Sequence, residues 1–178
     1  MLLQRLGIPF DIFSPAVDES PFDGEKAGEL VSRLAEDKAR AATLRFPSSV
    51  VIGSDQLAVC NEEIVGKPGT VANATRQLET FCGQTVYFLT AVSVLCDDTT
   101  FHFERTVATA VQFRNLSSAE INRYVEIDNP IDCAGSFKSE AAGISLLQSM
   151  TSEDPTAIIG LPLIAVSEAL RQAGLLVP

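Results

Sequence analysis

Asp55 follows a short apolar run and is the residue whose type and position most directly suggest chemistry. Residues 50–52 are branched and apolar, and they lead into Gly53 and Ser54 just before this acid. A continuous apolar run bounded by a turn signal is typical of a strand buried on both faces. Ligands of open α/β sheets gather at the carboxyl ends of such strands, so we expect Asp55 at a ligand site. A role as a turn residue or cap is the alternative that this stretch leaves open.

Two lysines and one further acid have positions that suit phosphate chemistry. Lys38 falls on the apolar side of a helix expected from about Ala27 to Leu44, and Lys67 lies in a loop of glycine and proline. Glu19 ends a loop that follows Pro15. Acids can hold a divalent metal and orient water, while lysines bind phosphate oxygens. For each lysine the alternative is solvation, by snorkelling in the case of Lys38.

The segment from Cys133 to Gly143 is the second unusual stretch. Small residues surround one aromatic residue, one cation and one acid, namely Phe137, Lys138 and Glu140. Small residues allow a ligand to approach the backbone closely, although a plain glycine-rich loop has the same composition. Phe137 is expected either to stack on a ligand ring or to belong to the core.

Other catalytic patterns are absent from the sequence. It contains no P-loop, no Rossmann glycine fingerprint, no serine-hydrolase motif and no zinc motif. The single histidine, His102, lies between Phe101 and Phe103 in a strand-like run. With a period of two it faces away from both phenylalanines, so we expect an exposed strand residue and not a catalyst.

The overall composition restricts the possible partners. The chain has 178 residues with 13 Lys and Arg against 23 Asp and Glu, a formal net charge of −10. Such acidity argues against long nucleic acid and anionic membrane, but permits a small polyphosphate where cations are local and a metal assists. The four cysteines have no metal-binding spacing, which indicates reduced thiols in a cytoplasmic protein. No apolar run approaches the ~20 residues of a membrane helix.

The hydrophobic pattern alternates between helical and strand-like segments and predicts an α/β chain. Helices are expected in the segments 2–6, 27–44, 71–81, 121–125 and 166–173, and strands in the segments 10–13, 50–52, 57–60, 64–65, 85–95, 99–113 and 144–147. Asp97 and Asp98 join the two longest strands, so these are expected to form a hairpin. Ser117 and Glu120 form a capping-box pattern at the start of one helix.

Five short motifs follow one another in an order found in one known family. These motifs are Val17-Asp18-Glu19, Leu34-Ala35-Glu36-Asp37-Lys38-Ala39, Gly53-Ser54-Asp55-Gln56, Gly66-Lys67-Pro68 and Gly160-Leu161-Pro162. With them, the sequence closely resembles the Maf family of nucleoside triphosphate pyrophosphatases over nearly its whole length. Residues 133–140 resemble the YceF-like subfamily.

The resemblance implies a fold, a reaction and a set of partners. The fold would be an elongated mixed β-sheet flanked by helices, with two lobes around a cleft, and the protein would commonly form a homodimer. The reaction would convert 7-methyl-GTP to 7-methyl-GMP and pyrophosphate with a divalent metal, Mg or Mn. The alternatives are the same hydrolysis of dTTP or UTP, and a nucleotide-binding regulator of septum formation without turnover.

The resemblance also implies roles for individual residues. Asp55 would be the proton acceptor, and Gln56 and Glu140 would determine substrate choice. Phosphate would be bound by Lys38, Lys67 and Lys138, and the metal by Glu19 and Asp55. Residues 1–178 are expected to form a single Maf-like domain that begins inside the family's first helix. The family's first strand and its serine-rich phosphate loop with an arginine pair are therefore expected to be missing.

Overall fold

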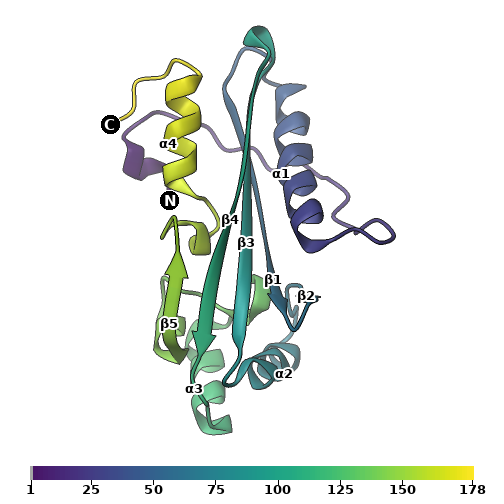
Figure 1. Ribbon diagram of the computed structural model, residues 1–178, viewed down its shortest axis with the longest axis vertical. Helices are drawn as coiled ribbons and strands as arrows, with labels where there is room; N and C mark the ends of the chain where they lie inside the picture. Colours follow the sequence, from purple (N-terminus) through teal and green to yellow (C-terminus); the bar gives the residue numbers. More distant parts are fainter. Residues whose placement is uncertain (1) are drawn as a thin grey trace. The chain divides into compact units, whose positions relative to one another are not determined.

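The computed structural model describes residues 2–178. The chain forms two compact units. Unit 1 consists of the residues up to Asp55 together with Thr90–Val107 and Asp154–Pro178. Unit 2 consists of Gln56–Leu89 and Ala108–Glu153. Helices and strands alternate along the chain, which confirms the α/β class (Figure 1).

A five-stranded sheet has the order β2-β1-β3-β4-β5. The strands are β1 (Val51–Cys60), β2 (Glu63–Val65), β3 (Thr85–Cys96), β4 (Phe101–Phe113) and β5 (Leu147–Ser152). The β1–β2 and β4–β5 pairs are antiparallel. Because β3 and β4 are sheet neighbours joined only by a short turn, the expected pairing of the two longest strands is confirmed.

Unit 1 contains the helices α1 (Ala27–Thr43) and α4 (Leu163–Gln172). Figure 1 draws the blue α1 and the yellow α4 on either side of the strands. One cluster of its core packs Val92 and Val94 of β3 with Val166 and Leu170 of α4. A second cluster joins Ala39 and Ala42 of α1 to Val51 and Leu95. Burial of such side chains is the main favourable contribution to folding.

Unit 2 contains the helices α2 (Val71–Phe81) and α3 (Ser118–Asp128). A chain of aromatic contacts forms much of its core. The ring centroids of Phe81 and Phe113 are 5.4 Å apart, those of Phe113 and Phe137 are 5.6 Å apart, and those of Phe137 and Phe88 are 5.6 Å apart. Tilted and edge-on arrangements such as these are the preferred geometries of aromatic pairs.

Two expected strands differ in the structure. Residues 8–22 contain no helix or strand, and Phe13 instead packs edge-on against Phe46 with centroids 5.7 Å apart. The expected strand at 144–147 is a 3-10 helix over Ala142–Leu146, and the strand begins only at Leu147. Short apolar alternation does not by itself supply a hydrogen-bonding neighbour, so both predictions were wrong. The first helix is a 3-10 turn over Leu3–Leu6 that ends at Gly7, as expected.

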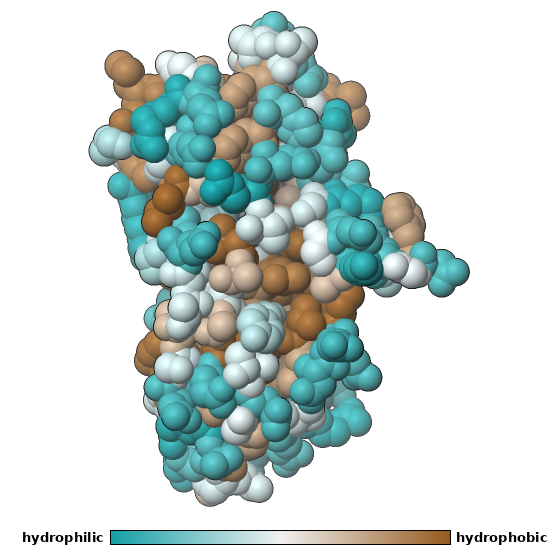
Figure 2. Space-filling view, viewed as in Figure 1, coloured by the Kyte–Doolittle hydropathy of each residue, from teal (hydrophilic) through white to brown (hydrophobic). Residues whose placement is uncertain are grey.

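The surface shown in Figure 2 is largely hydrophilic, with hydrophobic residues exposed in several places. Among the described residues, the most exposed large apolar side chains are Ile12, Phe22, Leu44, Ile127 and Leu176. Within residues 2–178, every helix is too short or too polar to cross a bilayer.

Candidate functional site

Asp55 lies in the middle of β1 and not at its end. The strand continues without a break from Val51 to Cys60, because a second apolar run follows Gln56. The expectation that Asp55 ends a strand was therefore wrong. Its side chain is 14% exposed. Since side chains alternate along a strand, Asp55 and Gln56 point to opposite faces of the sheet.

Lys38 of α1 joins two acids of unit 1. Its Nζ lies 2.6 Å from Oδ1 of Asp55 and 2.8 Å from Oε1 of Glu19. The helix thus brings together three of the residues expected from the sequence. Burial opposes the charge on Lys38, but its hydrogen bonds to Asp55 and Glu19 outweigh this effect and raise the pKa of the ammonium. Lys38 is therefore a stable positive charge between two carboxylates.

Gly53 permits the close approach of α1 that brings Lys38 to Asp55. A Cβ at this position would lie 2.3 Å from the carbonyl oxygen of Ala35 and 2.6 Å from the backbone nitrogen of Ala39. Both are helix backbone atoms, which cannot move aside as a flexible side chain can. The glycine of the Gly-Ser-Asp-Gln motif is thus explained by packing between strand and helix.

Ser54 explains a second position of the same motif. Its hydroxyl lies 2.7 Å from the carbonyl oxygen of Ala91 in β3 and 2.9 Å from that of Gly160. Gly160 has a positive φ of 104° and precedes α4. Two motifs separated by about a hundred residues are therefore linked by one hydroxyl, in the same unit as Asp55.

Asp154 is a buried acid that the sequence prediction missed. Its side chain accepts hydrogen bonds from the backbone nitrogens of Thr156, at 3.0 Å, and Ile164, at 2.6 Å. The backbone nitrogen of Ile164 is a donor in the first turn of α4. In the sequence, only Pro162 indicated where this helix starts. The signal that could have revealed Asp154 is the Asp-Pro-Thr turn just before the helix.

A pocket of about 520 Å³ lies in unit 1 beside Lys38. Gly53 and Ser54 of β1 line it together with residues 8–13 of the N-terminal segment. Pockets of this size hold small-molecule ligands. The N-terminal segment therefore takes part in a candidate ligand site although it forms no strand.

Lys138 belongs to unit 2 and is engaged with the end of α3. Its Nζ donates to the carbonyl oxygen of Asp128 at 2.7 Å, and its backbone nitrogen donates to the hydroxyl of Tyr124 at 3.0 Å. Cations near a helix C-terminus satisfy its last carbonyls.

Phe137 is 6% exposed and packs in the core, so the core alternative for this residue is confirmed. Glu140 is exposed.

Lys67 lines a second pocket of about 310 Å³ in unit 2. Arg76 of α2 lines the same pocket and adds a second cation, which the sequence prediction missed. The guanidinium is held by a hydrogen bond to the side-chain oxygen of Asn73. A loop lysine followed by an arginine in the middle of the next helix is the signal that could have indicated this pair.

The geometry of Glu19, Lys38 and Asp55 suits a divalent cation. Two carboxylates converge on one cationic nitrogen, and carboxylate oxygens are the ligands that Mg²⁺ and Mn²⁺ prefer. Lys38 also lines the pocket, so these groups of an α/β protein could hold a cation beside an anionic ligand.

The chain belongs to the Maf-like protein family, whose model matches residues 1–173. A relative from Aromatoleum aromaticum, named 7-methyl-GTP pyrophosphatase, is 52% identical over 178 residues, covering 100% of this chain and 92% of the relative. One from Polaromonas sp. with the same name is 50% identical, covering 97% of this chain and 79% of the relative. A third so named, from Idiomarina loihiensis, is 47% identical, covering 98% of this chain and 89% of the relative.

Proposed function

We propose that this chain hydrolyses 7-methyl-GTP to 7-methyl-GMP and pyrophosphate. The observation that carries the proposal is the bridge of Lys38 between Glu19 and Asp55, in a chain about half identical to several proteins named for this activity. Acids and a lysine at one point are the groups that phosphoanhydride hydrolysis needs.

In the proposed step, Asp55 acts as the general base. Its carboxylate accepts a proton from a water molecule, whose oxygen attacks the α-phosphorus of the nucleotide. The bond between this phosphorus and the bridging oxygen breaks, and pyrophosphate leaves with the bonding electrons. Partial burial of Asp55, at 14% exposure, limits competition from bulk water.

Lys38 orients Asp55 and can also bind the substrate. An ammonium has three donors, and Glu19 and Asp55 accept two of them among the described contacts. The third suits an oxygen of the triphosphate. Because its pKa is raised, Lys38 stays charged throughout the neutral range.

Glu19 and Asp55 would hold a divalent cation, Mg²⁺ or Mn²⁺. When bound, such an ion offsets the charge of the triphosphate and polarises its oxygens. The support for this assignment is that both carboxylates already converge on a single positive charge.

The residues of unit 2 are proposed to select the base and bind phosphate. Glu140 is an exposed carboxylate, which suits the positive charge that N7-methylation places on guanine. Gln56 is its proposed partner in substrate choice. Lys67 and Arg76 line one pocket and are proposed to bind phosphate oxygens. Lys138 is proposed to do the same on releasing the Asp128 carbonyl.

A nucleotide screen tests the proposed function. Purified protein is mixed with Mg²⁺ and either 7-methyl-GTP, GTP, dTTP or UTP, and pyrophosphate release is followed. We expect the highest kcat/KM with 7-methyl-GTP and no release after chelation of the metal. An Asp55→Asn preparation made in parallel excludes contaminating activity.

Two results of this screen would contradict the proposal. A higher kcat/KM with dTTP or UTP would assign the chain to the other substrate branch. Nucleotide binding without pyrophosphate release from any of the four would support a regulator of septum formation.

We also propose a cytoplasmic location and a homodimer. The four cysteines are free thiols, which a reducing compartment preserves. The dimer rests on the family resemblance, and light scattering coupled to size-exclusion chromatography tests it.

A further inference from the structure

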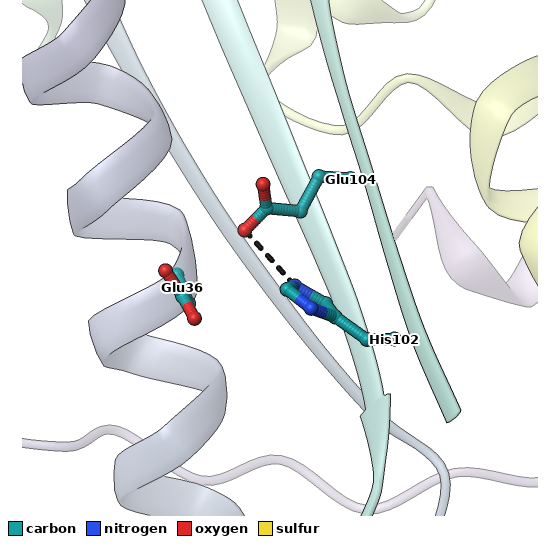
Figure 3. A group of neighbouring side chains, drawn as sticks. All are labelled: Glu36, His102 and Glu104. Atoms are coloured by element: carbon teal, nitrogen blue, oxygen red, sulfur yellow. Dashed lines mark hydrogen bonds and ion pairs between the residues drawn. The ribbon is translucent and has the colours of Figure 1, made fainter. Parts of the chain in front are cut away.

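Three metal-ligand side chains of unit 1 come together outside the Glu19–Lys38–Asp55 cluster. Glu36, His102 and Glu104 each offer one ligand atom, and these atoms all lie within 4.8 Å of one another (Figure 3). Neither the histidine nor Glu104 has a part in the proposed hydrolysis.

The packing of α1 along β4 places these side chains opposite one another. His102 and Glu104 are two residues apart on the strand and therefore share a face. His102 Nε2 lies 3.0 Å from Oε1 of Glu104. Ser32 lies one turn before Glu36 in α1, and its hydroxyl is 2.9 Å from the hydroxyl of Thr106 in β4. This second contact aligns the helix with the same face of the strand.

The charges of the cluster favour a cation. Two carboxylates lie close together, and like charges repel each other. Arg40 compensates part of this repulsion, because its Nε donates to Oε1 of Glu36 at 2.7 Å. A carboxylate has two oxygens, so Glu36 can contact Arg40 through one and a metal through the other.

We propose that Glu36, His102 and Glu104 form a Zn²⁺ site that links α1 to β4. Zinc binds histidine nitrogen and carboxylate oxygen at about 2.0–2.2 Å, with a water as fourth ligand. Tetrahedral geometry then requires ligand atoms roughly 3.4 Å apart. The side chains of His102 and Glu104 are 44% and 43% exposed, so they can rotate inward without disturbing the core. The imidazole selects zinc over magnesium, which prefers oxygen ligands.

The single histidine of the chain makes a specific test possible. Protein labelled with ¹⁵N and without an affinity tag is titrated with Zn²⁺, and the imidazole nitrogen signals are followed by NMR. Every such signal comes from His102, so zinc bound at a cysteine cannot imitate the result. We expect a saturable shift with Zn²⁺ and none with Mg²⁺ at the same concentration.

Variants separate a built site from a lone surface imidazole. We expect Glu36→Gln and Glu104→Gln each to weaken zinc binding at least about 10-fold, in line with the loss of one ligand contribution. Glu168→Gln removes an exposed carboxylate from the same unit and serves as the matched control, with unchanged affinity. An imidazole signal that does not move, or that moves equally in wild type and both ligand variants, would overturn the proposal.

The proposed link between α1 and β4 can be tested through the thermal stability of the protein. Because bound metal stabilises the folded state, Zn²⁺ should raise the Tm of the wild type in a concentration-dependent way. His102→Ala should remove this increase and keep its metal-free Tm, since the side chain is exposed. An equal increase in both proteins would show that zinc stabilises the chain elsewhere.

Discussion

Asp55 is the residue on which the proposed reaction most depends. Its replacement by Asn removes a charge but keeps the shape, and Lys38 retains Glu19 as a partner 2.8 Å away. We expect kcat to fall by about 10²- to 10⁴-fold, the usual cost of losing a general base, with little change in the circular dichroism spectrum. A variant that retains the wild-type kcat would show that Asp55 is structural.

Glu140 is the residue proposed to recognise the methylated base. Glu140→Gln removes the negative charge that favours a cationic guanine, so we expect a lower ratio of kcat/KM for 7-methyl-GTP over GTP. Glu126→Gln, another exposed acid of unit 2, is the control and should keep the wild-type ratio. If both variants keep it, Glu140 does not discriminate between the two nucleotides.

At the scale of elements, the start of α3 depends on a capping box. Glu120 accepts from the backbone nitrogen and hydroxyl of Ser117, each at 2.8 Å, and from Arg114 at 3.1 Å. The bonds from Ser117 and then the one from Arg114 lower the pKa of Glu120 from 4.5 to about 2. A lowered folded-state pKa means that this stabilisation is present above pH 4.5 and is lost as pH falls toward 2.

Replacement of Glu120 by Gln tests this pH dependence. We expect a lower Tm than wild type at pH 7, and a difference that shrinks as pH falls from 4.5 toward 2. Thermal unfolding followed by circular dichroism across this range measures it. A Tm difference that stays constant with pH would mean that the charge of Glu120 does not support the helix.

The contact between α1 and β1 depends on a glycine. Gly53→Ala would place a methyl group 2.3 Å from the Ala35 carbonyl oxygen, and we expect a loss of stability of roughly 1–3 kcal/mol. Turnover should fall as well, because the helix carries Lys38. The matched change Gly28→Ala, in α1 with open space around it, should instead stabilise by up to about 1 kcal/mol. Denaturant unfolding of both variants measures the change in the free energy of unfolding. An equal change in the two variants would contradict the packing argument.

At the scale of the whole molecule, the two units share the strands β1, β3 and β4, within which the unit boundaries fall. We therefore expect a single cooperative unfolding transition. The chain has two tyrosines and no tryptophan, and Tyr87 and Tyr124 both belong to unit 2. Gly53→Ala lies in unit 1, yet it should lower the midpoint seen by tyrosine fluorescence as much as the midpoint seen by circular dichroism. Separate midpoints would show that the units unfold independently.

Local sequence patterns are sufficient to predict the α/β class, the helices α1 to α4 and the hairpin of the two longest strands. These elements have strong periodicity, caps such as Thr70 and Ser117, and terminal glycines, all of which act within a few residues of the chain. The sequence also singled out Glu19, Lys38 and Asp55, because their motifs are short and contiguous.

How these residues meet depends on contacts between elements that are separate in the sequence. Asp55 lies inside a strand because the pairing of β1 extends beyond it, and no local signal distinguishes a turn from a continuing strand at Gly53-Ser54. Phe137 is in the core because Phe88, from a distant strand, packs against it. Lys138 contacts the end of α3 because the chain folds back onto that helix. Asp154 contacts Thr156 and Ile164, which are close to it in sequence, but an Asp-Pro-Thr turn alone does not indicate that the acid is buried. The Glu36–His102–Glu104 cluster joins a helix residue to two strand residues that are far from it in sequence, and only packing brings them together.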